Sequence, residues 1–271
     1  MSSVDADRSG SLTDPDYWAP YWKNIRLPRT VARNDWVSQE LAHKIKGYAR
    51  LGPGAPALEV GCSASAWLPF FQQEWGWRVE GIDYTTSGVV TARRNLDLLG
   101  VPGIIHEADV FDFAPTHAGQ YDLVFSYGVV EHFTQPVEIL RAMYDLLRPG
   151  GKVVVVVPHL NGIGGWLQQR VSQEIFDHHN PLQPADLRRE LGAAGFQQIA
   201  VGYIGREPLR VLNSPIRDTL PGPMFNTTLQ AREFLDKSIA QLSKVLRMPK
   251  RWVATYVLAC GMKPPATGGT L

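Results

Sequence analysis

The chain has 271 residues, of which 44% are hydrophobic and 20% charged, and its 27 Lys and Arg nearly balance 26 Asp and Glu. This composition is typical of a soluble globular protein, and the net charge of +1 argues against nucleic acid or a membrane surface as the main partner. Cys62 and Cys260 are too far apart in sequence to suggest a zinc site or a disulfide framework. The polar N-terminus excludes a secretory signal, and no apolar stretch is long enough to span a bilayer, so we expect a cytoplasmic protein.

Residues 1–16 show no periodic pattern, and we predict that they are flexible. Residues 17–55 are predicted to form an N-terminal helical lid, in which a helical pattern runs from the N-cap Asp35 to Ala49. The lid opens with four aromatic residues, Tyr17, Trp18, Tyr21 and Trp22. These rings either dock a helix on the core or fold over a bound ligand, and the sequence does not decide between the two.

From Ala57 onward, short apolar runs alternate with helical patterns, which is typical of βαβ units with a parallel sheet. The predicted strands of this part are 57–60, 78–82, 104–105, 123–125 and 153–157. The predicted helices are 65–75, 85–99 and 137–147. The run of five valines from Val153 to Val157 indicates a strand that is buried on both faces.

The pattern loosens after Pro158, where we predict a helical cap insertion before the last strand. The predicted elements are helices 165–173, 184–194 and 228–246, strands 196–203 and 252–260, and a loop over 206–224. The helix at 228–246 is amphipathic, and its apolar face is either a cap or the interface of a homodimer.

The sequence therefore predicts an α/β fold: a doubly wound, mostly parallel, seven-stranded Rossmann-like sheet. The main domain spans 56–262 and includes cap segments at about 160–182 and 206–248. Residues 263–271 are expected to be a flexible C-terminus.

Several motifs fall where predicted strands end. The sequence ALEVGCSAS, from Ala57 to Ser65, is a strand that enters a tight turn, where backbone N–H groups and a helix N-terminus can approach a ligand. Asp83 ends the next strand in EGID, and an acid there can accept both hydroxyls of a ribose. Asp109 follows the third strand, and the sequence YDLVFSYG is followed by EHF, which contains Glu131 and His132.

In this order, and with the RPGG turn before the valine run, the motifs over 57–158 resemble the class I S-adenosylmethionine-dependent methyltransferases, specifically the small-molecule "type 11" group. The resemblance implies S-adenosyl-L-methionine as the cofactor, with Asp83 on its ribose and Asp109 facing its adenine. The cofactor-binding residues that it implies are Glu59, Gly61, Cys62, Ser63, Asp83, Tyr84, Asp109, Val110, Phe111, Ser126, Tyr127 and Gly128. The chain departs from the family's Gly-x-Gly-x-Gly turn at Ser63 and Ser65.

The candidate catalytic residues are His132, His159 and Glu131, which follow the fourth and fifth strands and face the ligand crevice of such a sheet. Histidine is the natural proton acceptor near neutral pH, although each of these residues could instead be a packing residue. The candidate substrate residues are Tyr17, Tyr21, Trp22, Trp166 and His178. Asp177, His178 and His179 lack an evident third ligand, so we predict no metal site.

The resemblance implies methyl transfer to an O, N or C atom of a small, partly apolar molecule by in-line displacement, in the biosynthesis of a specialised metabolite. No basic stripe points to a nucleic-acid substrate. The alternative is a non-catalytic S-adenosylmethionine-binding protein or partner subunit, which Ser63 and Ser65 would favour. A nicotinamide-dependent oxidoreductase is disfavoured because the turn lacks the Gly-x-Gly-x-x-Gly pattern.

Overall fold

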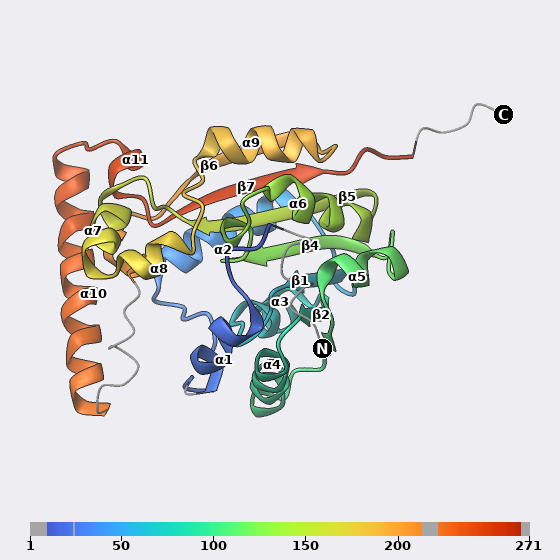
Figure 1. Ribbon diagram of the computed structural model, residues 1–271, viewed down its shortest axis with the longest axis horizontal. Helices are drawn as coiled ribbons and strands as arrows, with labels where there is room; N and C mark the ends of the chain where they lie inside the picture. The colour runs from blue at the N-terminus through green and yellow to red at the C-terminus, as the bar shows by residue number, and fades with distance from the viewer. Residues whose placement is uncertain (1–9, 24, 213–221, 267–271) are drawn as a thin grey trace.

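A seven-stranded sheet forms the centre of the computed structural model, which describes residues 10–23, 25–212 and 222–266 (Figure 1). The strands are β1 (Pro56–Val60), β2 (Arg78–Asp83), β3 (Ile104–Glu107), β4 (Tyr121–Tyr127), β5 (Leu147–Pro158), β6 (Gln197–Ile204) and β7 (Tyr256–Met262). Their order in the sheet is β3-β2-β1-β4-β5-β7-β6, and only β7 runs antiparallel to its neighbours. The predicted doubly wound, mostly parallel sheet is confirmed.

Helices cover both faces of the sheet. They are α1 (Pro15–Lys23), α2 (Trp36–Ala49), α3 (Trp67–Trp75), α4 (Thr86–Leu99), α5 (Val110–Thr116), α6 (Pro136–Leu146), α7 (Ile163–Val171), α8 (Gln173–Asp177), α9 (Pro184–Ala193), α10 (Gly222–Val245) and α11 (Lys250–Val253). Helices α2, α3 and α4 pack on one face, and α5, α6 and α9 pack on the other. Two short 3-10 helices, Val130–His132 and Pro208–Val211, complete the described part of the chain.

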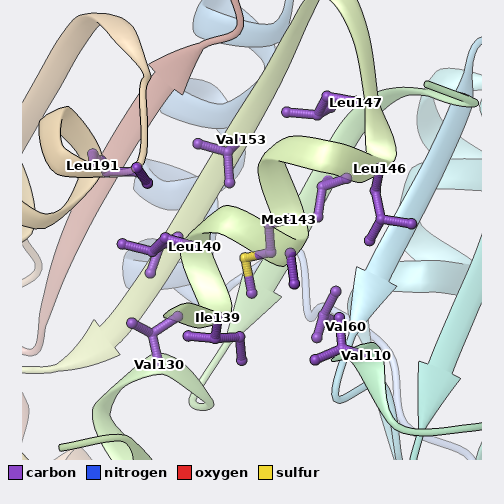
Figure 2. Packing of buried hydrophobic residues seen from close by; sticks show 14 of the residues in the cluster. Val60, Val110, Val130, Ile139, Leu140, Met143, Leu146, Leu147, Val153 and Leu191 are labelled. Atoms are coloured by element: carbon purple, nitrogen blue, oxygen red, sulfur yellow. The ribbon is translucent and has the colours of Figure 1, made fainter. Parts of the chain in front are cut away.

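The apolar residues of α6 form part of the core on the second face of the sheet. Ile139, Leu140, Met143 and Leu146 recur at helical spacing in α6, and all four are buried against the sheet (Figure 2). Val153, from the valine run of β5, lies in the same cluster. This strand is buried on both faces, as its sequence predicts, because neighbouring valines belong to the two opposite clusters.

The C-terminal part departs from the prediction in three places. The expected loop over 206–224 contains the 3-10 helix at 208–211 and the first residues of α10, while 213–221 lies outside the described residues. The last strand begins at Tyr256 because α11 occupies 250–253, so the predicted start at Trp252 is wrong. The predicted helix at 165–173 is two helices, α7 and α8, with Ser172 as the N-cap of the second.

The predicted lid segment divides into two parts with different surroundings. Helix α2 is bound into the first face of the sheet, where Val37, Leu41 and Ile45 are buried among residues of α3 and α4. Helix α1 lies against α4 at the carboxyl edge of the sheet. Of the predicted flexible ends, residues 1–9 and 267–271 lie outside the described residues.

Candidate active site

A cavity of about 420 Å³ lies at the carboxyl ends of β1, β2, β3 and β4. The chain reverses its strand order between β1 and β4, and ligands of open α/β sheets bind at such a switch point. The residues that line the cavity are Ser11, Thr13, Asp14, Pro15, Trp18, Trp22, Val60, Gly61, Ile82, Asp83, Tyr84, Ala108, Asp109, Val110, Phe111, Tyr127, Gly128, Val129, His132, Phe133 and Ile139. Motifs from four strand ends and the N-terminal segment therefore meet at one place.

The turn after β1 forms the floor of the cavity. The backbone N–H groups of Gly61 and Cys62 both donate to Ile82 O, at 2.8 and 3.1 Å, which ties the turn to β2. Gly61 has φ +72°, and a Cβ there would lie 2.4 Å from Cγ2 of Val129. Glycine is therefore required at this position both for its backbone conformation and for the close approach of the chain after β4.

The two serines that replace family glycines have defined structural roles. Ser63 has φ +25° and donates its N–H to Asp83 Oδ2 at 3.0 Å. Ser65 Oγ donates to Glu59 Oε2 at 2.5 Å and accepts the N–H of Trp67 at 2.9 Å, so it caps the start of α3. Burial raises the pKa of Glu59 to about 8. Glu59 therefore holds the turn through its hydrogen bond with Ser65, and it does not line the cavity.

Asp83 links the first turn to the next helix. Its buried carboxylate accepts from Ser63 N through one oxygen, and from Thr85 N (2.9 Å) and Thr85 Oγ1 (2.7 Å) through the other. Burial raises the pKa of Asp83, and the three hydrogen bonds counter that effect. The carboxylate lines the cavity at the point where β2 ends. The neighbouring Tyr84, which also lines it, is hydrogen-bonded to Thr13 of the N-terminal segment.

Asp109 and the residues after it form the far wall. Asp109 is the N-cap of α5, and its Oδ1 accepts from Phe111 N at 2.9 Å. Burial raises the pKa of this carboxyl as well. Val110 and Phe111 line the cavity beside it, and Phe111 meets Phe133 edge to face at 6.0 Å. An acid flanked by apolar side chains suits a flat, polar ring such as adenine.

The N-terminal segment forms a roof over the cavity, defined here as Gly10 to Lys23. Leu12 N donates to His132 O at 2.7 Å, and Thr134 N donates to Gly10 O at 2.9 Å. These bonds fasten the roof to the chain that follows β4. The stacked rings of Trp18 and Trp22 then cover the opening, with their centroids 5.8 Å apart.

His132 is the candidate catalytic residue that the structure places in the cavity. Its Nδ1 lies 2.7 Å from His178 O, and a carbonyl can only accept, so the proton is on Nδ1 and Nε2 has a free lone pair. The rings of Trp18 and His132 meet edge to face, with their centroids 5.0 Å apart. Burial, reinforced by His179, lowers the pKa of His132 to about 3. The ring is therefore a neutral hydrogen-bond acceptor across the physiological range.

The other two candidate catalytic residues do not line the cavity. His159 Nε2 donates to Arg251 O at 2.8 Å, and this side chain is buried near α7 and α11. Glu131 is fully buried, and burial raises its pKa to about 8. Its backbone oxygen accepts from Asn180 N at 2.6 Å, which connects the chain after β4 to the chain after α8. In the described structure neither side chain reaches the cavity lining.

Replacing Glu131 with glutamine is expected to stabilise the protein at alkaline pH. The folded-state pKa of about 8 lies above the ordinary value of 4.5, so the folded protein binds the Glu131 proton more tightly than the unfolded chain does. The stability that this difference provides is fully present at acid pH and is lost as the pH rises through about 8. Glutamine removes this loss, which we expect to be on the order of 2 kcal/mol between about pH 6 and about pH 9. Urea unfolding at both pH values measures it, with the exposed Glu233→Gln as control. An equal loss of stability in Glu131→Gln and wild type would contradict the assignment.

Of the candidate substrate residues, only Trp22 lines the cavity. Tyr17 stacks on His178 at 4.5 Å, and Tyr21 meets Trp18 edge to face at 5.9 Å, so these side chains support the roof. Trp166 is half-exposed on α7, where the Arg170 guanidinium lies 3.7 Å from its ring. Among the predicted cofactor residues, four do not line the cavity and lie in the protein behind its surface: Glu59, Cys62, Ser63 and Ser126.

Other lining residues were missed from the sequence. Val60, Ile82, Ala108 and Val129 are immediate neighbours of predicted residues, and their position at strand ends was a usable signal. Ser11, Thr13, Asp14 and Pro15 lie in the part that was expected to be flexible, and nothing local marks them as cavity residues. Within the described ranges, no three His, Cys, Asp or Glu side chains gather as a metal site. In the same ranges, no helix combines the length and hydropathy of a transmembrane span.

Comparisons with known proteins identify the family. Residues 33–201 match the family model described as "Methyltransferase domain". Over 171 residues, the chain is 28% identical to the ubiquinone biosynthesis O-methyltransferase of Sodalis glossinidius, covering 61% of this chain and 66% of that one. It is 32% identical to the protein of the same name from Xanthomonas axonopodis, covering 60% and 71%.

Among solved structures, a Haemonchus contortus phosphoethanolamine N-methyltransferase in complex with S-adenosyl-L-methionine shares the fold, with a TM-score of 0.57 and 16% identity. The match covers 93% of this chain and 57% of that one. The chain belongs to the methyltransferase-domain family, and within it to the class I S-adenosylmethionine-dependent methyltransferases.

The cavity residues fit S-adenosylmethionine. Ser63 Oγ, Ser126 Oγ and Glu131 Oε2, which lie behind the lining, are buried atoms with no hydrogen-bond partner among the described residues. Gly61 leaves the floor open, where a Cβ would collide with Val129. The Asp83 carboxyl lines the wall. A cavity with an open glycine floor and an acid on its wall suits the polar groups of this cofactor.

Proposed function

We propose that the chain transfers a methyl group from S-adenosylmethionine to a hydroxyl of a small, partly apolar molecule. The observation that carries this proposal is that one cavity combines Asp83, Asp109 and the free Nε2 of His132 beneath the aromatic roof. Acidic groups for the cofactor and a neutral imidazole for the acceptor are thereby within one cavity. The two relatives named above are O-methyltransferases, which favours oxygen over nitrogen or carbon as the acceptor atom.

The residues have separate roles in the proposed reaction. When bound, the cofactor supplies an electrophilic methyl group on a sulfonium sulfur. Asp83 and Asp109 hold the ribose and the adenine, and the backbone at Gly61 and Gly128 approaches the methionine part. Trp18 and Trp22 exclude water, and alignment of donor and acceptor supplies most of the rate enhancement.

His132 completes the reaction by taking a proton. Its Nε2 accepts a hydrogen bond from the acceptor hydroxyl and orients it. The hydroxyl proton becomes strongly acidic as the oxygen forms its new bond to carbon. An imidazole of low pKa is therefore still basic enough to remove this proton. The fixed bond from Nδ1 to His178 O holds the ring in the required tautomer.

The lining also indicates the class of acceptor. Trp18 and Trp22 of the roof line the cavity, and Phe133, Val129 and Ile139 add apolar surface. Such walls favour an aromatic or apolar ring that carries a hydroxyl. We include in the proposal a role in the biosynthesis of a specialised metabolite of this kind.

Titration calorimetry and a turnover assay test this function together. We expect the protein to bind S-adenosylmethionine and its demethylated product at micromolar concentration, with no heat from NADH as the control ligand. Incubation with a panel of phenols and catechols should then produce demethylated cofactor. Binding without turnover on any phenol, amine or carbon acid would instead favour the non-catalytic alternative. Because Ser63 and Ser65 are hydrogen-bonded parts of the turn, their presence does not by itself favour that alternative.

A further inference from the structure

Helix α10 presents apolar side chains to solvent and polar side chains to the protein. Phe234 is 71% exposed, Leu242 is 56% exposed and Val245 is 69% exposed. Asp236 and Ser243, on the other side of the same helix, are buried. A helix that packs on a globular core has the opposite arrangement.

Specific hydrogen bonds hold the polar side inward. Asp236 Oδ1 accepts from Leu209 N at 2.8 Å. Ser243 Oγ accepts from Arg206 Nη1 at 3.2 Å and donates to Ala240 O at 2.8 Å. Turning the apolar side inward would break these bonds and leave the N–H of Leu209 without the carboxylate that accepts from it, so the outward orientation is built into the fold.

Exposed basic residues occur along the same stretch of chain as the apolar side chains. The outward apolar face, defined here as Phe234, Leu235, Leu242, Val245 and Leu246, is followed along the chain by the half-exposed Trp252. The exposed basic residues of this stretch are Lys237, Arg247 and Arg251, together with Lys244, whose Nζ lies 5.1 Å from the ring centroid of Trp36. Within the described residues 230–252, Glu233 is the one exposed acid. The net charge of +1 for the whole chain, which argued against a membrane surface as the main partner, does not report this local excess.

We propose that the outward apolar face of α10 docks on an anionic lipid surface. A helix with a polar side, an apolar side and flanking lysines and arginines lies in the membrane interface, where apolar side chains enter the acyl boundary and cations meet lipid phosphates. Helix α10 runs along one end of the molecule, at the left of Figure 1, where a flat surface can reach it. None of its described residues lines the cavity, so docking leaves the active site intact.

A second copy of the chain is the rival occupant, and the charges disfavour it. Two α10 helices packed antiparallel, with Leu235 of each at the level of Leu246 of the other, also bring Lys237 of each to the level of Lys244 of the other. A parallel pair brings each lysine next to its own counterpart. Both arrangements place like charges side by side, whereas an anionic surface neutralises them.

Co-sedimentation with vesicles tests the proposal. The full chain is mixed with phosphatidylcholine vesicles, or with vesicles in which about one third of the lipid is phosphatidylglycerol. We expect partition into the anionic vesicles only, with release at high salt. The double variant Leu235→Glu/Leu242→Glu should lower partition by about tenfold or more. Lys237→Gln/Arg247→Gln should weaken partition more at low salt than at moderate salt, because screening already reduces the attraction of these charges at moderate salt.

The matched control places two glutamates on another exposed helix. Val90 and Leu98 of α4 are 58% and 54% exposed, and Val90→Glu/Leu98→Glu should keep wild-type partition. Cofactor binding by each variant verifies that it is folded. Absence of partition into anionic vesicles, or equal loss in both double variants, would overturn the proposal. So would a concentration-dependent dimer that Leu235→Glu/Leu242→Glu abolishes, because the face would then be covered by a second copy.

Discussion

Replacing Asp83 with alanine is expected to weaken S-adenosylmethionine binding on the order of 100-fold. The carboxylate is proposed to accept both ribose hydroxyls, and charge-assisted hydrogen bonds of this kind contribute about 1.5–3 kcal/mol each. The same carboxylate holds Ser63 N and both donors of Thr85. The alanine variant therefore loses ligand contacts and also the brace between the first turn and the start of α4.

Two further variants separate these contributions. Asp83→Asn retains one oxygen acceptor and the size of the side chain, so it should keep the fold and lose most of the charge-assisted affinity. Glu59→Gln changes a buried acid that braces the turn without lining the cavity, and it should retain much of the binding. Calorimetry with the purified variants gives the dissociation constants, and thermal unfolding reports the fold. Unchanged affinity in Asp83→Ala would refute the ribose assignment.

Replacing His132 with alanine should lower turnover by about 10²–10⁴-fold while leaving the affinity for the cofactor intact. The expected loss comes from removing the only imidazole acceptor that lines the described part of the cavity. Because burial holds the pKa of His132 at about 3, ionisation of this ring should not reduce the rate between about pH 8 and about pH 5. A variant that retains a side-chain acceptor, His132→Gln, should orient the hydroxyl but remove the proton poorly.

His179→Ala is the matched control for this prediction. Its ring lies 4.5 Å from that of His132, centroid to centroid, and does not line the cavity. Turnover should fall much less in this variant than in His132→Ala, as measured by the demethylated product formed at saturating cofactor. Full activity of His132→Ala would mean that alignment alone carries the reaction, and a rate that falls with protonation near pH 6.5 would contradict the neutral, buried state.

Much of the cofactor wall could be predicted from the sequence. Asp83 and Asp109 line the cavity at the ends of predicted strands because the carboxyl ends of parallel strands meet at one edge. Glu59, Cys62, Ser63 and Ser126 were placed in the same region but lie behind the surface. The period-two alternation of a strand is lost in a turn, so sequence position alone does not tell which side chains there point outward.

The sequence by itself determined the strands, the mostly parallel sheet and the cavity edge, since apolar periodicity and turn residues act over a few neighbouring positions. The order of the strands in the sheet came from the tertiary structure. Only the tertiary structure distinguished His132 from His159, because the distinction depends on carbonyl partners at His178 and Arg251 that are distant in sequence. The orientation of α10 was decided in the same way. Its apolar residues predicted either a cap face or a homodimer interface, and hydrogen bonds from Arg206 and Leu209 hold its polar side inward, so the apolar side does not cap the core. Buried polar groups must be satisfied wherever the fold places them, and that requirement cannot be read from local spacing.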